Sequence, residues 1–251
     1  MRLYFKQDGI SLYLGDCREF SAPPCDLTLA DPPYGETSLT WDQWPETWVD
    51  TLQSRSLWCF GSIRMLLEHF QEFSGWKFAQ DIVWEKQNGS SFHSDRFRRV
   101  HEGLTHWYTG KWSSLHKSPV MTPDAVSRQL RRKHRPPHMG HIGEGAYESQ
   151  DGGPRMMRSV IYARNCHGYA EHPTQKPVAI LQPLIEYSCP PNGLVYVPFA
   201  GVGSELVAAR FLGRKAIGVE IDERYCEAAA NRLSSYLPIA LESAMQHKDV
   251  I

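Results

Sequence analysis

The chain has 251 residues, of which 41% are hydrophobic and 22% charged, and its formal net charge is −1 at pH 7. This composition is ordinary for a globular protein of one large or two modest domains that buries a core. No apolar run approaches the roughly 18 residues of a membrane helix, and the first residues lack the apolar stretch of a signal peptide, so we expect a cytoplasmic protein without membrane contact.

The cysteines and histidines give no sign of a metal site. Six cysteines are scattered singly and never form a C-x-x-C pair, which argues against zinc and against a disulfide framework. They are Cys17, Cys25, Cys59, Cys166, Cys189 and Cys226. His134, His138 and His141 have no acidic or thiol neighbour at ligand spacing. We therefore expect reduced, structural cysteines and no metal ion.

The charges are distributed unevenly along the chain. Residues 86–170 contain 14 Lys and Arg against 6 Asp and Glu, whereas the remainder has 13 against 22. Aromatic residues such as Trp107, Trp112 and Tyr147 are interspersed among the basic ones. A basic stretch is often only a solvated surface, but basic and aromatic residues together favour contact with nucleic-acid phosphates and bases.

Strands and helices alternate through the first 109 residues. Residues 3–15 alternate apolar and polar side chains around Asp8-Gly9, which predicts a hairpin whose second arm ends before Asp16. Further strands are expected up to Asp31 and over 56–60, 81–86 and 104–109. Helices are expected from Pro45 to near Ser54 and over 63–73. This alternation indicates an α/β fold with a mostly parallel sheet.

The alternation stops between about residues 110 and 168. This stretch is rich in proline and glycine and contains the basic cluster Arg131-Arg132-Lys133-His134-Arg135. It therefore predicts a loop-rich insert that faces the substrate and does not continue the sheet.

Regular structure returns in the last third of the chain. A helix around 180–185 precedes a strand over 193–199, the turn Ala200-Gly201-Val202-Gly203-Ser204, a helix over 206–212, a strand over 215–220 and a last helix from Asp222. A strand, a glycine turn, a helix and a strand ending in an acid are typical of nucleotide binding, with Glu220 placed to accept the ribose hydroxyls. Leu206 replaces the third glycine of dinucleotide sites. A nucleoside with a small carboxylate, such as S-adenosylmethionine, is the better ligand.

The sequence Asp31-Pro32-Pro33-Tyr34 ends a buried apolar run, so it lies at the carboxyl end of a strand. The Asp31 carboxylate and the Pro32 carbonyl could accept hydrogen bonds from an exocyclic amine as it becomes pyramidal in a methyl-transfer transition state. The ring of Tyr34 offers a face on which a base can stack. An ordinary strand-to-turn junction is the alternative, and the motifs further along the chain decide against it.

Three motifs together resemble the β group of bacterial and phage DNA amino-methyltransferases. They are Asp31-Pro32-Pro33-Tyr34, then His172-Pro173-Thr174-Gln175-Lys176-Pro177, then Phe199-Ala200-Gly201-Val202-Gly203. The resemblance implies a Rossmann-like S-adenosylmethionine-dependent methyltransferase fold with circularly permuted motif order. Residues 1–109 and 169–251 would form the catalytic and cofactor-binding domain, and residues 110–168 the target-recognition insert. It also implies the cytoplasm of a bacterial cell or a phage-infected host.

The resemblance assigns roles to individual residues. The catalytic set is Asp31, Pro32, Pro33 and Tyr34. The cofactor-binding set is Asp16, Cys17, Asp31, Thr174, Lys176, Phe199, Ala200, Gly201, Gly203, Ser204, Glu220 and Ile221, with Thr174 and Lys176 on the methionine carboxylate. The DNA-binding set is Arg131, Arg132, Lys133 and Arg135. One departure is Val197, which stands where the family usually has an acid.

The implied substrate is double-stranded DNA with its target base flipped out, and a homodimer is left open. Asp31 as the first motif residue is typical of adenine-N6 enzymes, whereas cytosine-N4 enzymes more often have serine there, so adenine is favoured. Cytosine-N4 methylation and an RNA or protein amine methyltransferase are the alternative enzymes. A DNA-binding protein without catalysis is less favoured, because both motif sets are intact apart from Val197.

Overall fold

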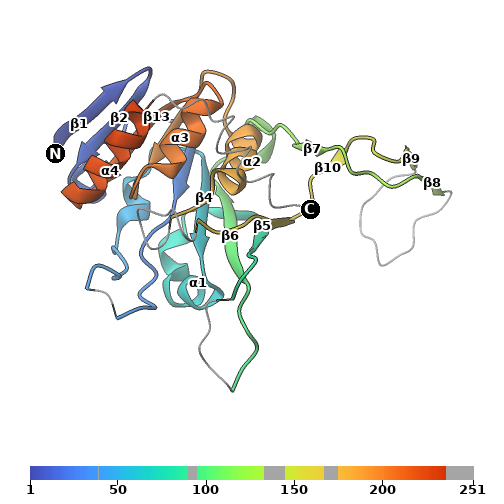
Figure 1. Ribbon diagram of the computed structural model, residues 1–251, viewed down its shortest axis with the longest axis horizontal. Helices are drawn as coiled ribbons and strands as arrows, with labels where there is room; N and C mark the ends of the chain where they lie inside the picture. Colours follow the sequence, from blue (N-terminus) through green and yellow to red (C-terminus); the bar gives the residue numbers. More distant parts are fainter. Residues whose placement is uncertain (39, 90–94, 133–144, 167–174, 236–251) are drawn as a thin grey trace. The chain divides into compact units, whose positions relative to one another are not determined.

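The computed structural model describes residues 1–38, 40–89, 95–132, 145–166 and 175–235. The chain forms two compact units (Figure 1). Unit 1 comprises Met1–Ser118 and Ser159–Ile251, and unit 2 comprises Pro119–Arg158.

Among its described residues, unit 1 contains a nine-stranded sheet in the order β1-β2-β13-β12-β3-β4-β6-β5-β11. The strands are β1 (Arg2–Gln7), β2 (Ile10–Leu14), β3 (Leu27–Ala30), β4 (Ser56–Gly61), β5 (Lys77–Glu85), β6 (His101–Tyr108), β11 (Val160–Tyr162), β12 (Leu194–Val197) and β13 (Lys215–Glu220). Strands β3 and β4 are buried along their whole length, as expected for central strands covered on both faces.

Five neighbouring strands, β2, β13, β12, β3 and β4, run parallel to one another. Strand β6 lies antiparallel between β4 and β5, and β1 is the antiparallel arm of the predicted hairpin. The predicted α/β class with a mostly parallel sheet is confirmed. Because parallel strands end at the same edge, the residues that follow β2, β13, β12 and β3 gather along one edge of the sheet.

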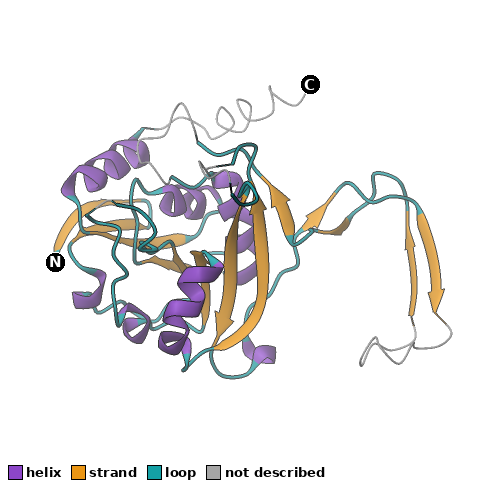
Figure 2. Ribbon diagram, turned by 90° about the horizontal axis from the view of Figure 1, so that it is seen from below, coloured by secondary structure: helices purple, strands orange, loops and turns teal. Residues whose placement is uncertain are grey.

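Helical segments lie on both sides of the sheet (Figure 2). Helices α2 (Val178–Ser188), α3 (Ser204–Phe211) and α4 (Glu223–Ser234) pack together on one side. On the other side, α1 (Ile63–His69) and short 3-10 turns form a core cluster around Trp48, Phe73 and Trp107. Trp48 meets Phe73 edge to face, and Phe73 stacks on Trp107. These ring contacts hold the helical segments of this side together.

Three expectations about secondary structure were wrong. The helix expected from Pro45 is only a 3-10 turn at Trp48–Thr51, because Thr47 adopts a left-handed φ of 68° that a helix cannot continue through. The helix over 63–73 changes to a 3-10 turn after His69. Finally, we expected no sheet strand within 110–168, but Val160–Tyr162 pairs in parallel with β5.

Unit 2 contains two small antiparallel sheets. Strand β7 (Met121–Thr122) pairs with β10 (Arg155–Met156), and β8 (Arg128–Arg132) pairs with β9 (Gly145–Ser149). An ion pair joins Arg155 of β10 to Asp124, which lies just after β7. We expected a loop-rich stretch here; its described residues form these four short strands with loops between them.

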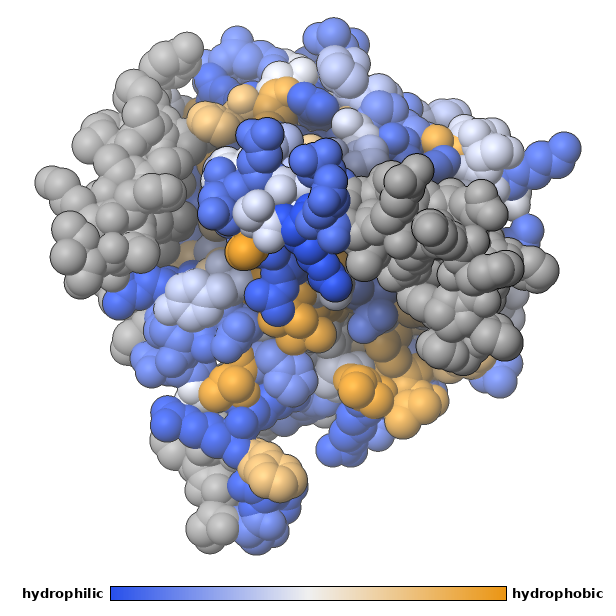
Figure 3. All heavy atoms as spheres, turned by 90° about the vertical axis from the view of Figure 1, so that its right-hand side faces the viewer, coloured by the Kyte–Doolittle hydropathy of each residue, from blue (hydrophilic) through white to orange (hydrophobic). Residues whose placement is uncertain are grey.

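The face drawn in Figure 3 is mostly hydrophilic, with hydrophobic side chains in separate spots. Among the described residues, none of the helices combines the length and hydrophobicity that a membrane span requires.

Candidate active site

Most of the residues singled out in the sequence meet at the edge where the parallel strands end. Asp31 directly follows β3, and Asp16 follows β2 after one glycine. Glu220 is the last residue of β13, and the turn containing Gly201 follows β12. Since β2, β13, β12 and β3 are consecutive in the sheet, these four positions form one row.

Asp31 is the centre of a buried network of charges. Its Oδ1 accepts a hydrogen bond from the Tyr34 hydroxyl at 2.8 Å, and its Oδ2 lies 2.6 Å from Lys176 Nζ. Glu102 of β6 lies 2.7 Å from the same Tyr34 hydroxyl and 3.1 Å from Lys176 Nζ. Lys86 pairs with the other Glu102 oxygen at 2.6 Å. Two acids thus share one phenol and one lysine.

The protons in this network are limited. A phenol has one proton, so Tyr34 can donate a full hydrogen bond to only one of the two carboxylates. The second carboxyl group can lie this close to the phenol oxygen when that carboxyl group is itself protonated and donates. Burial raises the pKa of Asp31, and the nearby Glu102 charge adds to the effect. For Glu102 burial acts in the same direction, but Lys176 and Lys86 outweigh it and lower its pKa to about 2. Asp31 is therefore the carboxyl of the two that takes up a proton more readily.

Sequence reasoning missed Glu102 and Lys86. Glu102 is a buried acid near the start of β6, and a buried acid of this kind needs a partner. That pattern could have marked Glu102 as unusual, but not its neighbours, because Tyr34 is 68 residues away along the chain. For Tyr34, the sequence suggested a role for the ring face, and the structure adds these contacts of the hydroxyl.

The glycine turn after β12 has the backbone that its sequence predicted. Gly201 and Gly203 have φ values of 47° and 76°, which favour glycine. The Gly201 N–H donates to Glu220 Oε2 at 2.7 Å, and Glu220 Oε1 accepts from the Asp222 N–H at 2.8 Å. Burial raises the pKa of Glu220. The carboxylate is thus held at the turn, with lone pairs left for further donors.

The remaining predicted cofactor residues differ in their surroundings. The Asp16 carboxylate accepts hydrogen bonds from the Arg18 side chain and backbone, which lower its pKa. Cys17 is buried, and burial raises its pKa to about 12. Phe199 meets Trp48 edge to face at 5.1 Å between ring centroids.

Two further members of this set are buried and one is exposed. Ala200 and Ser204 are buried at the turn, and the Ser204 hydroxyl accepts a hydrogen bond from Arg232. Ile221 is 69% exposed, so its side chain is free to cover a ligand rather than to pack in the core. Pro32 is buried and Pro33 is half-buried beside Asp31.

The remaining predicted residues differ in what the structure describes of them. Thr174, Lys133 and Arg135 are outside the described residues. Arg131 and Arg132 end β8 in unit 2. Lys176, expected to meet the methionine carboxylate, has its ammonium group at Asp31 and Glu102. Its role toward the cofactor stays a prediction.

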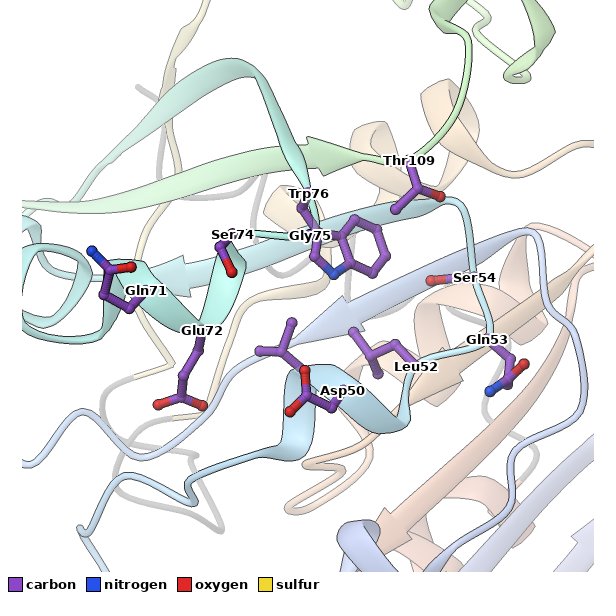
Figure 4. A pocket seen from close by; sticks show the side chains of 11 residues that line it. Asp50, Leu52, Gln53, Ser54, Gln71, Glu72, Ser74, Gly75, Trp76 and Thr109 are labelled. Atoms are coloured by element: carbon purple, nitrogen blue, oxygen red, sulfur yellow. The ribbon is translucent and has the colours of Figure 1, made fainter.

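A cavity of about 660 Å³ lies at the opposite end of the strands (Figure 4). Its lining includes Ser54, which precedes β4, Trp76, which precedes β5, and Thr109, which follows the antiparallel β6. These positions belong to the amino-terminal edge of the sheet, away from Asp31. We therefore do not assign this cavity to the chemistry.

The strand-end row fits S-adenosylmethionine. Apart from its chain neighbours, no described residue has an atom within 4 Å of the place that a side chain at position 201 would occupy, so the turn is open on this side. Glu220 can accept ribose hydroxyls, and acids along the row suit a cofactor with a sulfonium and an ammonium group.

Comparisons with known proteins show the family of this chain. The model of the N6/N4 DNA methylase family, described as "DNA methylase", matches residues 25–231. M.HinfI of Haemophilus influenzae, a type II methyltransferase, is 26% identical over 262 aligned residues, which cover 89% of this chain and 68% of that protein. YubD of Escherichia coli (strain K12) is 40% identical over 116 residues, which are 43% of this chain and 47% of YubD, so that match spans about half of the relative.

Solved structures show the same fold. The M1.HpyAVI–SAM complex has a TM-score of 0.61 at 19% identity and covers 90% of this chain and 99% of its own. The PvuII DNA methyltransferase, which is cytosine-N4-specific, has a TM-score of 0.62 at 15% identity. The match covers 98% of this chain and 94% of the PvuII enzyme. The methyltransferase fold implied by the sequence motifs is confirmed. The chain belongs to the N6/N4 DNA methylase family, the S-adenosylmethionine-dependent DNA amino-methyltransferases.

Proposed function

We propose that this chain methylates the N6 amino group of adenine in double-stranded DNA, with the target base turned out of the duplex. The observation that supports this most directly is the row of strand ends that places Asp31 and Tyr34 beside the Gly201 turn and Glu220. Asp31 as the first residue of its motif favours adenine over cytosine, through the resemblance described above.

The residues around Asp31 have the properties that amine methylation requires. The Asp31 carboxylate and the Pro32 carbonyl would accept the two N–H groups of the substrate amine. Each carboxylate oxygen has two lone pairs, so Asp31 Oδ1 can accept the substrate N–H while it keeps the Tyr34 hydrogen bond. Bound S-adenosylmethionine supplies a methyl group on a positively charged sulfur. The amine gives up a proton as its new bond forms, and Asp31, whose pKa burial raises, can accept it.

The duplex would meet basic segments near this edge. Residues 95–99 precede β6 and contain three arginines and Phe97, which is fully exposed. Arg99 pairs with Glu36, two residues after Tyr34, at 3.2 Å, which ties this segment to the catalytic loop. Exposed arginines suit phosphates, and an exposed aromatic ring suits a base step opened by flipping. Unit 2, with Arg131 and Arg132, is proposed as the target-recognition part.

Product analysis tests the proposal. The purified protein is incubated with S-adenosylmethionine and unmethylated plasmid DNA, total RNA or a protein mixture, and the hydrolysed products are separated by mass spectrometry. We expect N6-methyladenine in DNA and none in the parallel reaction with Asp31→Ala. N4-methylcytosine would replace the base assignment, and methylation of RNA or protein alone would overturn the DNA substrate.

A further inference from the structure

Glu205 is a buried acid that the chemistry above does not use. It lies in the first turn of α3, directly after the Gly201–Gly203 turn, and is 4% exposed. Among the described residues, only its own backbone N–H hydrogen-bonds to its carboxylate. Buried carboxylates are rare unless they are paired. Within the part of the chain that the structure describes, Glu205 therefore has no close cation of the kind that burial of a charge normally requires.

The cations that act on Glu205 have closer partners. Arg232 of α4 donates to the Val202 carbonyl at 2.6 Å and to the Ser204 hydroxyl. Lys176 forms ion pairs with Asp31 and Glu102. Both act on Glu205 only through space, and the Asp31 charge opposes them. Burial and Asp31 together raise the pKa of Glu205 to about 7, and the N-terminal end of α3 offsets part of this cost.

The position of Glu205 suggests what its carboxylate binds. Val197, the last residue of β12, is apolar and fully buried, so this strand offers no acid where the resemblance led us to expect one. The glycine turn presents N–H donors, which cannot bind an ammonium group. Eight residues beyond Val197, Glu205 brings a carboxylate back to the same turn.

We propose that Glu205 binds the α-ammonium group of the methionine part of S-adenosylmethionine, in place of the acid missing at position 197. The proposal deepens the cofactor assignment and rests on it. The cation would supply the partner that the buried carboxylate lacks. Since only the ionised carboxylate binds an ammonium group strongly, the contact should weaken as the pH falls below about 7.

A pair of ligands that differ only in the ammonium group isolates this contact. Calorimetry compares S-adenosylhomocysteine with its analogue that lacks the α-amino group and keeps the adenosine, sulfur and carboxylate. A charge-assisted hydrogen bond in a buried site predicts a preference of roughly 10- to 100-fold for the amino ligand in the wild type. In Glu205→Gln the preference should fall to about 3-fold or less. Glu223→Gln, the same change in the first turn of α4 at an exposed position, is the matched control and should keep the full preference.

The pH dependence of the ligand preference is a second measurement. The wild-type preference for the amino ligand should shrink between pH 8 and pH 6, because Glu205 takes up a proton while the ligand ammonium stays charged. The pKa of Asp31 is also raised, so the pH dependence is assigned to Glu205 only if Glu205→Gln abolishes it. An unchanged preference in a folded Glu205→Gln variant, or a wild-type preference that does not depend on pH, overturns the proposal. A wild type that binds neither ligand contradicts the cofactor assignment instead.

Discussion

Replacing Lys176 with methionine tests how the buried charges beside Asp31 are held. The Lys176 side chain is 3% exposed, and its ammonium group lies 2.6 Å from Asp31 Oδ2 and 3.1 Å from Glu102 Oε1. Methionine keeps much of the apolar length and removes the charge. Lys86 still pairs with Glu102 in this variant, so the carboxylate of Asp31 loses most. We expect a less stable protein at neutral pH.

The size of the effect follows from the chemistry of Asp31. Removing one partner of a buried ion pair costs about 3–5 kcal/mol. Asp31 can limit the destabilisation caused by its unpaired charge by binding a proton. Protonating a carboxyl with an ordinary pKa of about 3.9 costs about 4 kcal/mol at pH 7 and about 2 kcal/mol at pH 5.5. Since burial raises the folded-state pKa of Asp31, protonation favours the folded protein at low pH, and the penalty grows as the pH rises. The destabilisation should therefore be about 2 kcal/mol smaller at pH 5.5 than at pH 7.

Urea unfolding of wild type and variant at both pH values measures this difference. The double variant with Asp31→Asn and Lys176→Met removes both charges and should regain most of the stability. Lys215→Met, at an exposed position of β13, is the control and should change stability by less than about 0.5 kcal/mol. A destabilisation below about 1 kcal/mol at pH 7, or an equal destabilisation at both pH values, would refute the reasoning.

Three further outcomes are expected. Asp31→Ala should abolish methyl transfer and leave a folded protein that still binds DNA, measured by product formation, circular dichroism and gel shift; activity within a few-fold of wild type would remove Asp31 from the catalytic role. Tyr34→Phe keeps the stacking ring and should retain more activity than Tyr34→Ala, although removal of the hydroxyl between two carboxylates should shift the pH profile of kcat; equally low activity in both variants would contradict stacking. Neutralising four basic residues together should flatten the slope of log affinity for DNA against log salt by up to ~0.9 for each phosphate that the protein no longer neutralises, with cofactor affinity unchanged. These residues are Arg131, Arg132, Lys133 and Arg135.

Local sequence signals predicted the parts of the site that each strand end provides. Pro32 and Pro33 stop a buried apolar run, and that alone puts Asp31 at the carboxyl end of a strand. Gly201 and Glu220 are 19 residues apart, the length of a turn, a helix and a strand, and the structure joins them by a hydrogen bond. These predictions succeed because the residues that decide the geometry are close together in the sequence.

Contacts between distant segments could not be predicted in this way. Glu102 reaches Tyr34 because β6 runs antiparallel between β4 and β5, and periodicity gives no information about that order. Lys176 meets Asp31 across 145 residues of sequence. The helix expected after Pro45 failed for a local reason, since Thr47 adopts a left-handed backbone that residue type alone does not indicate.

The acids at this edge relate the stability of the free protein to its affinity for a cationic cofactor. Burial raises the pKa of both Asp31 and Glu205, and the Asp31 charge raises that of Glu205 further. Both therefore favour the folded protein when protonated and oppose folding increasingly as the pH rises. A bound cation has the opposite effect, because it stabilises the ionised form of each. Lys176 offsets part of this charge, and we propose that the negative charge that remains attracts the sulfonium and ammonium groups of the cofactor.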